Sequence, residues 1–210
     1  MSEFTSGSLT LLKYKEAITE FRPVYINDLN NQWVVFITED TYVSEELPES
    51  CIQISEAAPV LYFYNFEDHC WGYRIVHNGQ EVASVHLSYE LEHTMLMNLA
   101  EERFPEVDDL IDFLYIDPKG QPVREQLIEE IGNSEAYKEA IAEQFEHRNV
   151  DSFKLFNISD DVIEQLEGMM NIEAFLQLES EHELVEQFKI LINVEEMSWL
   201  RADRIPEQED

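Results

Sequence analysis

The spacing of apolar residues changes near residue 91, and this change constrains the fold more than any other feature of the chain. Before it, apolar and aromatic residues form two continuous runs, Trp33–Ile37 and Val60–Phe66. Such runs are typical of strands that are covered on both faces. After it, Leu91, Met95 and Leu99 recur at helical spacing. Strands followed by helices indicate an α+β fold with a mainly antiparallel N-terminal sheet.

The clearest element is a β-hairpin that joins residues 69–76 to residues 81–89. Asn78 and Gly79 lie between the two segments. An Asn-Gly pair favours a two-residue type I′ turn, because both residues tolerate the positive φ angles that this turn requires. The sequence therefore predicts two paired antiparallel strands with a fixed register.

A regular hairpin with this turn places Trp71 opposite His86, and side chains then alternate between two faces. One face carries His69, Trp71, Tyr73, Ile75, His77, Val82, Ser84 and His86. The other carries Cys70, Gly72, Arg74, Val76, Ala83, Val85 and Leu87. We assign the second face to the core because it is smaller and more apolar, with Arg74 at its rim. Val85 and Leu87 are then expected to be buried and Glu81 to be exposed.

Helices are expected at both ends of this sheet. Apolar residues at helical spacing predict an N-terminal helix over residues 9–21, ended by Pro23. Later helices are predicted from residue 91 to Pro105, over residues 106–114, from Pro122 to Gly132, from Ser134, from Ser159 and from Ser180. Residues 151–158 are compatible with a short strand or with an irregular connection.

The same pattern suggests how the chain is divided. We expect a β-rich subdomain over residues 1–92, a helical subdomain of about five or six helices over residues 93–205, and an acidic tail over residues 206–210. Whether the two parts are separate domains or share one core stays open at this point.

The chain is strongly acidic, with 45 acidic and 13 basic side chains and a formal net charge of −32. Residues 93–210 hold 30 of the acids and 9 of the bases. A field of this sign repels nucleic acid and anionic lipid, and it attracts basic proteins. Acidity as a general habit of composition, without a specific use, remains the alternative.

The two cysteines and the N-terminus bear on where the chain resides. Cys51 and Cys70 are too few and too far apart to indicate a disulfide framework or a zinc finger. Residues 1–7 are polar, and no run of 18 apolar residues occurs. These observations predict a cytoplasmic protein without a membrane span.

Few residues form a pattern that indicates chemistry. His69 and His86 are weak metal candidates, because the hairpin register supplies no third ligand. We therefore expect no cofactor. The acids Asp108, Asp109, Asp112, Glu129 and Glu130 have the spacing of solvated helix faces rather than of buried catalytic pairs.

The function that these features favour is a non-catalytic protein-binding module that engages a basic partner, in the manner of a neutraliser or inhibitor. Its expected binding surface consists of Asp108, Asp109, Asp112, Glu129, Glu130, Trp71 and Tyr73. The alternative is a metal-dependent or hydrolytic enzyme with a site around His69, Trp71 and His86. A structural or regulatory protein is a third possibility, and the oligomeric state stays open.

Overall fold

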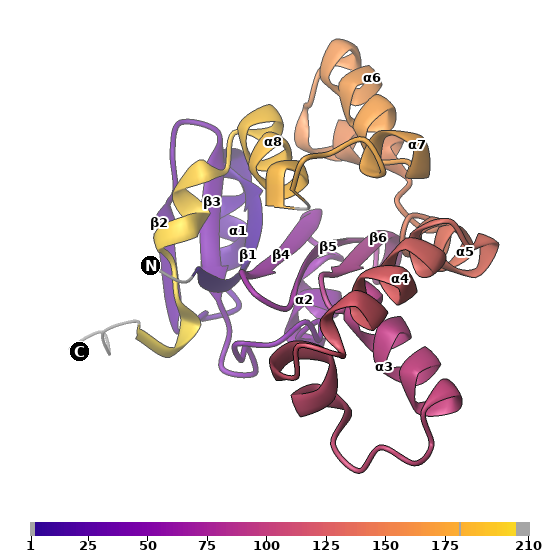
Figure 1. Cartoon of the computed structure of the whole chain (residues 1–210). Coiled ribbons are helices and arrows are strands. Elements are labelled where there is room, and N and C mark those ends of the chain that lie inside the picture. The colour runs from indigo at the N-terminus through magenta and orange to yellow at the C-terminus, as the bar shows by residue number, and fades with distance from the viewer. Residues whose placement is uncertain (1–2, 181, 205–210) are drawn as a thin grey trace. The chain divides into compact units, whose positions relative to one another are not determined.

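The computed structural model describes residues 3–180 and 182–204. The chain forms two compact units (Figure 1): unit 1 comprises Met1–Leu87 with Phe145–Asp210, and unit 2 comprises Ser88–Gln144. The last helices thus group with the sheet, whereas the sequence suggested one division after residue 92. The expected acidic tail over residues 206–210 lies outside the described residues. An antiparallel sheet followed by helices gives the α+β class that was predicted.

Unit 1 contains a six-stranded sheet with the strand order β2-β3-β1-β4-β5-β6. The strands are β1 (Phe4–Leu11), β2 (Tyr25–Asp28), β3 (Trp33–Ile37), β4 (Val60–Phe66), β5 (Cys70–His77) and β6 (Gln80–Ser88). The two continuous apolar runs are β3 and β4, and every residue of both strands is buried. This confirms that they are covered on both faces.

The prediction of a helix over residues 9–21 is wrong for the first half of that range. Leu9 and Leu11 complete β1, and two short helical pieces follow, η1 (Leu12–Tyr14) and α1 (Lys15–Thr19). Tertiary pairing overrides the helical spacing here, because β1 lies between β3 and β4 and is bonded to both.

β1 is central although half of its residues are polar. Its buried hydroxyl groups have partners outside the strand: Thr5 donates to the Met197 carbonyl at 2.7 Å, and Thr10 donates to the Pro59 carbonyl at 2.7 Å. Buried hydroxyl groups are tolerated when they are hydrogen-bonded in this way. The strand therefore has no apolar signature in the sequence.

The face of β5 that carries Trp71 and Tyr73 is covered by α8 (His182–Ile192). The Phe188 ring lies 5.2 Å from the Trp71 ring and 5.3 Å from the Tyr73 ring, between centroids. Both Trp71 and Tyr73 are fully buried. Their expected place on a solvated binding face is therefore wrong, because an apolar helix stripe packs on that face.

The opposite face of the sheet packs against α2 (Glu49–Ile54). Cys51 and Ile54 from this helix form a buried cluster with Phe36 and Val60 of the sheet. Both sheet faces in unit 1 are thus closed by helices.

The turn of the β5–β6 hairpin has the expected form. Asn78 and Gly79 have φ angles of 51° and 72°, as a type I′ turn requires. Val85 and Leu87 are buried and Glu81 is exposed, which confirms that prediction.

His86 nevertheless lies on the face opposite to the expected one. Tyr64 pairs with Gly72 across β4 and β5, and its hydroxyl oxygen lies 2.9 Å from His86 Nδ1. His86 is therefore on the face of Gly72, not on that of Trp71. At His86, the pairing of β6 with β5 is therefore shifted by one residue from the register of a regular hairpin. A β-bulge between the turn and His86 produces such a shift.

The outer edge of β6 is bonded to the segment that follows residue 145 in unit 1. Ser84 N donates to the His147 carbonyl at 2.8 Å, and Asn149 Nδ2 donates to the Val82 carbonyl at 2.8 Å. Covering an edge strand in this way removes a template for pairing with other chains.

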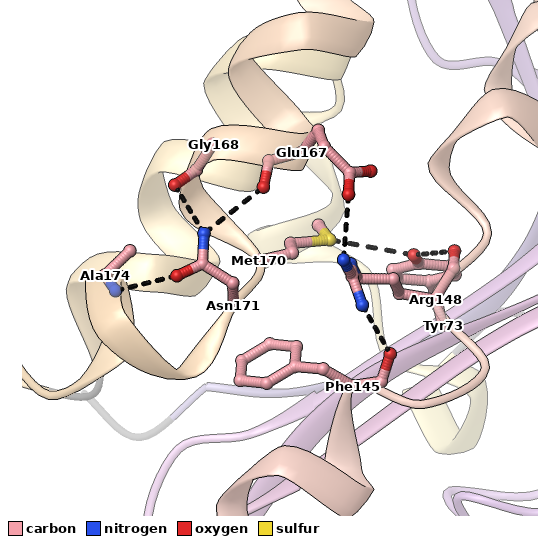
Figure 2. A network of polar contacts seen from close by, with 8 residues as sticks. All are labelled: Tyr73, Phe145, Arg148, Glu167, Gly168, Met170, Asn171 and Ala174. Atoms are coloured by element: carbon pink, nitrogen blue, oxygen red, sulfur yellow. Dashed lines mark hydrogen bonds and ion pairs between the residues drawn. The ribbon is translucent and has the colours of Figure 1, made fainter.

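A polar network connects β5 to the helices that follow residue 148 in unit 1 (Figure 2). The Tyr73 hydroxyl donates to the Arg148 carbonyl at 2.7 Å, and Arg148 Nη2 bonds Glu167 at 2.8 Å in α6 (Asp160–Met169). Asn171 accepts a bond from Ala174 N at 2.9 Å and so caps α7 (Ile172–Phe175). Residues 151–158, which were open between strand and connection, belong mainly to the 3₁₀ helix η3 (Val150–Phe156).

We expect Tyr73→Phe to lower the free energy of unfolding of unit 1 by about 1 kcal/mol, because it leaves the Arg148 carbonyl without this buried donor. Urea unfolding followed by tryptophan fluorescence measures the loss, since all three tryptophans belong to unit 1. Tyr25→Phe is the matched control, because the Tyr25 hydroxyl makes an exposed 3.4 Å contact with Asn27. Equal effects of the two changes would contradict the prediction.

Unit 2 consists of α3 (Leu91–Arg103), the π-helical turn η2 (Asp112–Ile116), α4 (Gln121–Gly132) and α5 (Glu135–Gln144). Pro122 lies in the first turn of α4 and Gly132 is its last residue, as predicted. The helix expected over residues 106–114 is displaced toward the C-terminus and is a π-helical turn instead. Within the described part of the chain, no helix is both long and apolar enough to cross a membrane.

Candidate functional site

A groove opens on the surface of unit 2 between α3 and α4. Its floor is apolar, and its volume is about 330 Å³. The residues that line it are Met95, Asn98, Leu99, Glu102, Glu130, Ile131 and Ser134. All seven belong to unit 2, so the groove is complete within one compact unit.

The groove exists because α3 leaves part of its apolar stripe accessible. Met95 and Leu99, which recur at helical spacing in the sequence, are only half-buried. Leu96 and Ala100 are buried in their place. An apolar stripe therefore stays accessible along α3 and forms one wall of the groove.

The groove has an acidic rim. Glu130 forms an ion pair with Arg103 across α3 and α4. Glu102 is exposed and has no ion pair with any described residue. One rim carboxylate is therefore partly neutralised and the other is available to a cation.

The five acids predicted for the binding surface are all exposed in unit 2. Glu130 lines the groove, whereas Glu129 and the aspartates do not. Asp109 accepts a bond from Asp112 N at 2.9 Å at the start of the π-helical turn. The structure therefore does not gather the five carboxylates into a single site.

Apolar side chains are exposed beside these aspartates. Ile111 is 58% exposed and Ile116 is 68% exposed. Tyr115 lies between them in sequence, with its hydroxyl 2.9 Å from His93 Nδ1 and its ring 4.5 Å from the Arg124 guanidinium. Exposed apolar groups next to carboxylates are typical of surfaces that contact a protein.

A second cluster lies in unit 1 around His86. One ligand-type atom each from Glu45, Cys70 and His86 lie within 4.8 Å of one another. Glu45 Oε2 is 3.2 Å from His86 Nδ1 and 4.0 Å from Cys70 Sγ. Carboxylate, thiol and imidazole groups together can hold a transition metal.

A tyrosine beside this cluster is held in its neutral form. Burial raises the pKa of Tyr64 above its ordinary value, and the nearby Cys70 raises it further. The Tyr64 hydroxyl therefore keeps its proton at neutral pH next to His86. Burial likewise raises the pKa of the Cys51 thiol to about 12, so Cys51 is not a reactive thiolate.

Of the two histidines that were weak metal candidates, only His86 belongs to this cluster. The His69 ring packs instead at 6.3 Å from the Phe4 ring. Glu45 and Cys70 were not predicted as partners of His86, because Glu45 lies in a loop far away in sequence and the register error placed Cys70 on the other face. No sequence signal links these three residues.

The comparisons with known proteins give no match: no family model, no curated protein and no solved structure is similar to this chain.

Proposed function

We propose that this protein is a non-catalytic binding module that engages a basic protein partner through unit 2. The observation that supports this most directly is the groove between α3 and α4, with an apolar floor and a rim that carries Glu102 and Glu130. A lysine or arginine side chain suits such a groove, because its aliphatic stem can lie on the floor while its charged end meets the carboxylates.

The charge of unit 2 supports a basic partner. Ser88–Gln144 contains 15 acidic and 4 basic side chains, a net charge of −11. Such a field accelerates the encounter with a basic surface and disfavours nucleic acid. The exposed Ile111 and Ile116 add apolar area beside the carboxylates, which charge alone does not provide.

We place this interaction in the cytoplasm. Cys51 and Cys70 form no disulfide and are both buried, and reduced thiols are usual in that compartment. A binding module there would meet its partner at a salt concentration that only partly screens its charge.

Affinity capture from native lysate tests the proposal when three baits are run in parallel. The baits are the unaltered chain, Glu102→Gln/Glu130→Gln in the groove, and Glu139→Gln/Glu143→Gln on α5. The two variants lose the same charge, and all four glutamates are exposed. We expect a basic protein that binds the unaltered chain and the α5 variant, and that binds the groove variant at least about tenfold more weakly when purified.

Salt dependence is the second readout of the same partner. We expect its association rate to fall about tenfold or more between 0.1 M and 1 M salt, because the Debye length falls from about 10 Å to about 3 Å. Neutralising Asp108, Asp109, Asp112, Glu129 and Glu130 together should lower the rate further. Rates that do not change with salt, or equal retention on all three baits, would refute the proposed function.

A further inference from the structure

We propose that Glu45, Cys70 and His86 form a binding site for a zinc-class divalent cation in unit 1. The proposal is independent of the binding function of unit 2, since all three residues belong to the other compact unit. It rests on the donor atoms that the fold brings together and on the distances between them.

Two separations between the donor atoms are close to those around a tetrahedral ion, and all three donor atoms lie within 4.8 Å of one another. Ligand atoms around Zn²⁺ lie about 3.3–3.8 Å apart, because its bonds to O, N and S are about 2.0–2.3 Å long. Glu45 Oε2 is 3.2 Å from His86 Nδ1, and Cys70 Sγ is 4.0 Å from Glu45 Oε2. Both separations are close to these values without any rearrangement of the backbone.

The three side chains differ in how firmly the fold holds them, and this difference suits a metal site. Cys70 is buried on β5 and provides a fixed donor. Glu45 and His86 are each about half exposed, with side-chain exposures of 51% and 46%, so both can adjust to an ion. The loop next to Glu45 is held by the Tyr62 hydroxyl, which donates to the Ser44 carbonyl at 2.7 Å.

Gly72 leaves the space in which Tyr64 reaches His86. A side chain at this position would overlap the Tyr64 hydroxyl group and the Val85 carbonyl. With glycine there, the Tyr64 ring lies across β5 and its hydroxyl reaches His86 Nδ1 at 2.9 Å. Tyr64 therefore positions the histidine ring beside the cluster while the site is empty, and its hydroxyl gives up this hydrogen bond when His86 Nδ1 binds an ion.

The donor set selects among cations. A thiolate and an imidazole favour Zn²⁺ and its neighbours over Mg²⁺ and Ca²⁺, which prefer oxygen ligands. The Cys70 thiol releases its proton to solvent on binding, so the thiolate and the Glu45 carboxylate balance the charge of the ion. Three protein ligands leave a fourth position for water.

Cobalt provides the test, because Co²⁺ replaces Zn²⁺ and reports on its ligands by absorption. The full chain is stripped with a chelator and titrated with Co²⁺ alone, then with Zn²⁺. We expect one equivalent of Co²⁺ to produce the near-ultraviolet band of a thiolate ligand and the visible bands of a tetrahedral ion. Zn²⁺ should abolish both.

Variants assign the ligands. Cys70→Ala should remove the thiolate band, and Glu45→Gln and His86→Ala should each weaken Co²⁺ binding by about tenfold or more. His69→Ala is the matched histidine control and should bind as the unaltered chain does. Glu45 is exposed, so its variant keeps the test valid even if Cys70→Ala does not fold.

Two results would overturn the proposal. One is the lack of a thiolate band with Co²⁺ in excess, which would show that only surface carboxylates bind the ion. The other is a thiolate band that persists in Cys70→Ala, which would assign the ligand to Cys51.

Discussion

Lys189→Ala is expected to lower the free energy of unfolding of unit 1 by about 3–5 kcal/mol, because it removes one partner of a buried ion pair. Lys189 is 1% exposed, and its Nζ lies 3.0 Å from Glu3 Oε2 and 2.7 Å from Ser198 Oγ. Its other carboxylate partner, Glu186, is exposed. Without the ammonium group, the largely buried Glu3 carboxylate loses this cation. Urea unfolding followed by tryptophan fluorescence measures the change.

Two comparisons separate the buried charge from ordinary loss of contacts. Lys138→Ala removes an exposed pair with Glu135 at 2.8 Å and should cost less than about 1 kcal/mol. Lys189→Met combined with Glu3→Gln should be more stable than Lys189→Ala, because no unpaired charge is left in the core. If Lys189→Ala and Lys138→Ala prove equally mild, the ion pair does not hold the two ends of unit 1 together.

Gly72→Ala is expected to destabilise unit 1 by about 3 kcal/mol or more. A methyl group at this position overlaps the Val85 carbonyl oxygen and the Tyr64 hydroxyl group. The carbonyl belongs to the backbone of the neighbouring strand and cannot move without separating β5 from β6. Overpacking of this kind usually costs about 1–3 kcal/mol, and a backbone contact raises the cost.

The control for this change is another glycine. Gly168 lies in α6 and has no atom within 4 Å of the position of a methyl group. Gly168→Ala should therefore stabilise unit 1 by about 0.5–1 kcal/mol, because alanine favours a helix. Adding Tyr64→Phe to Gly72→Ala should recover only part of the loss, since the contact with Val85 remains. A Gly72→Ala protein as stable as the unaltered chain would refute this account of the sheet.

The sequence was sufficient to predict those elements whose signals are local. The continuous apolar runs of β3 and β4 gave their bounds, and the Asn78-Gly79 pair gave the turn of the hairpin. Pro122 and Gly132 gave the ends of α4. Each of these signals depends on a few neighbouring residues and on no distant partner.

The elements that were missed depend on distant partners. β1 is polar because its hydroxyl groups bond carbonyls such as that of Met197, which lies 192 positions away in the chain. The register of β6 departs from a regular hairpin, and alternation of side chains cannot reveal such an extra residue. The local pattern likewise could not predict that Phe188 of α8 packs on Trp71.

The candidate sites also differ in whether they depend on local signals or on distant residues. The exposed acids of unit 2 could be predicted from composition and helical spacing. The groove could not, because it depends on which stripe of α3 faces α4. The cluster of Glu45, Cys70 and His86 required both the correct register and a loop that returns over the sheet.

The position of β1 has a consequence for how the protein is made. β1 and the neighbouring Glu3 leave the ribosome well before their partners, because Thr5 bonds the Met197 carbonyl 192 positions later and Glu3 bonds Lys189 186 positions later. Unit 2 is one continuous segment, and its ends are joined where Ser88 N donates to Gln144 Oε1 at 2.8 Å. We therefore expect unit 2 to fold during translation before β1 gains these partners, which become available only when α8 and the residues after it have left the ribosome.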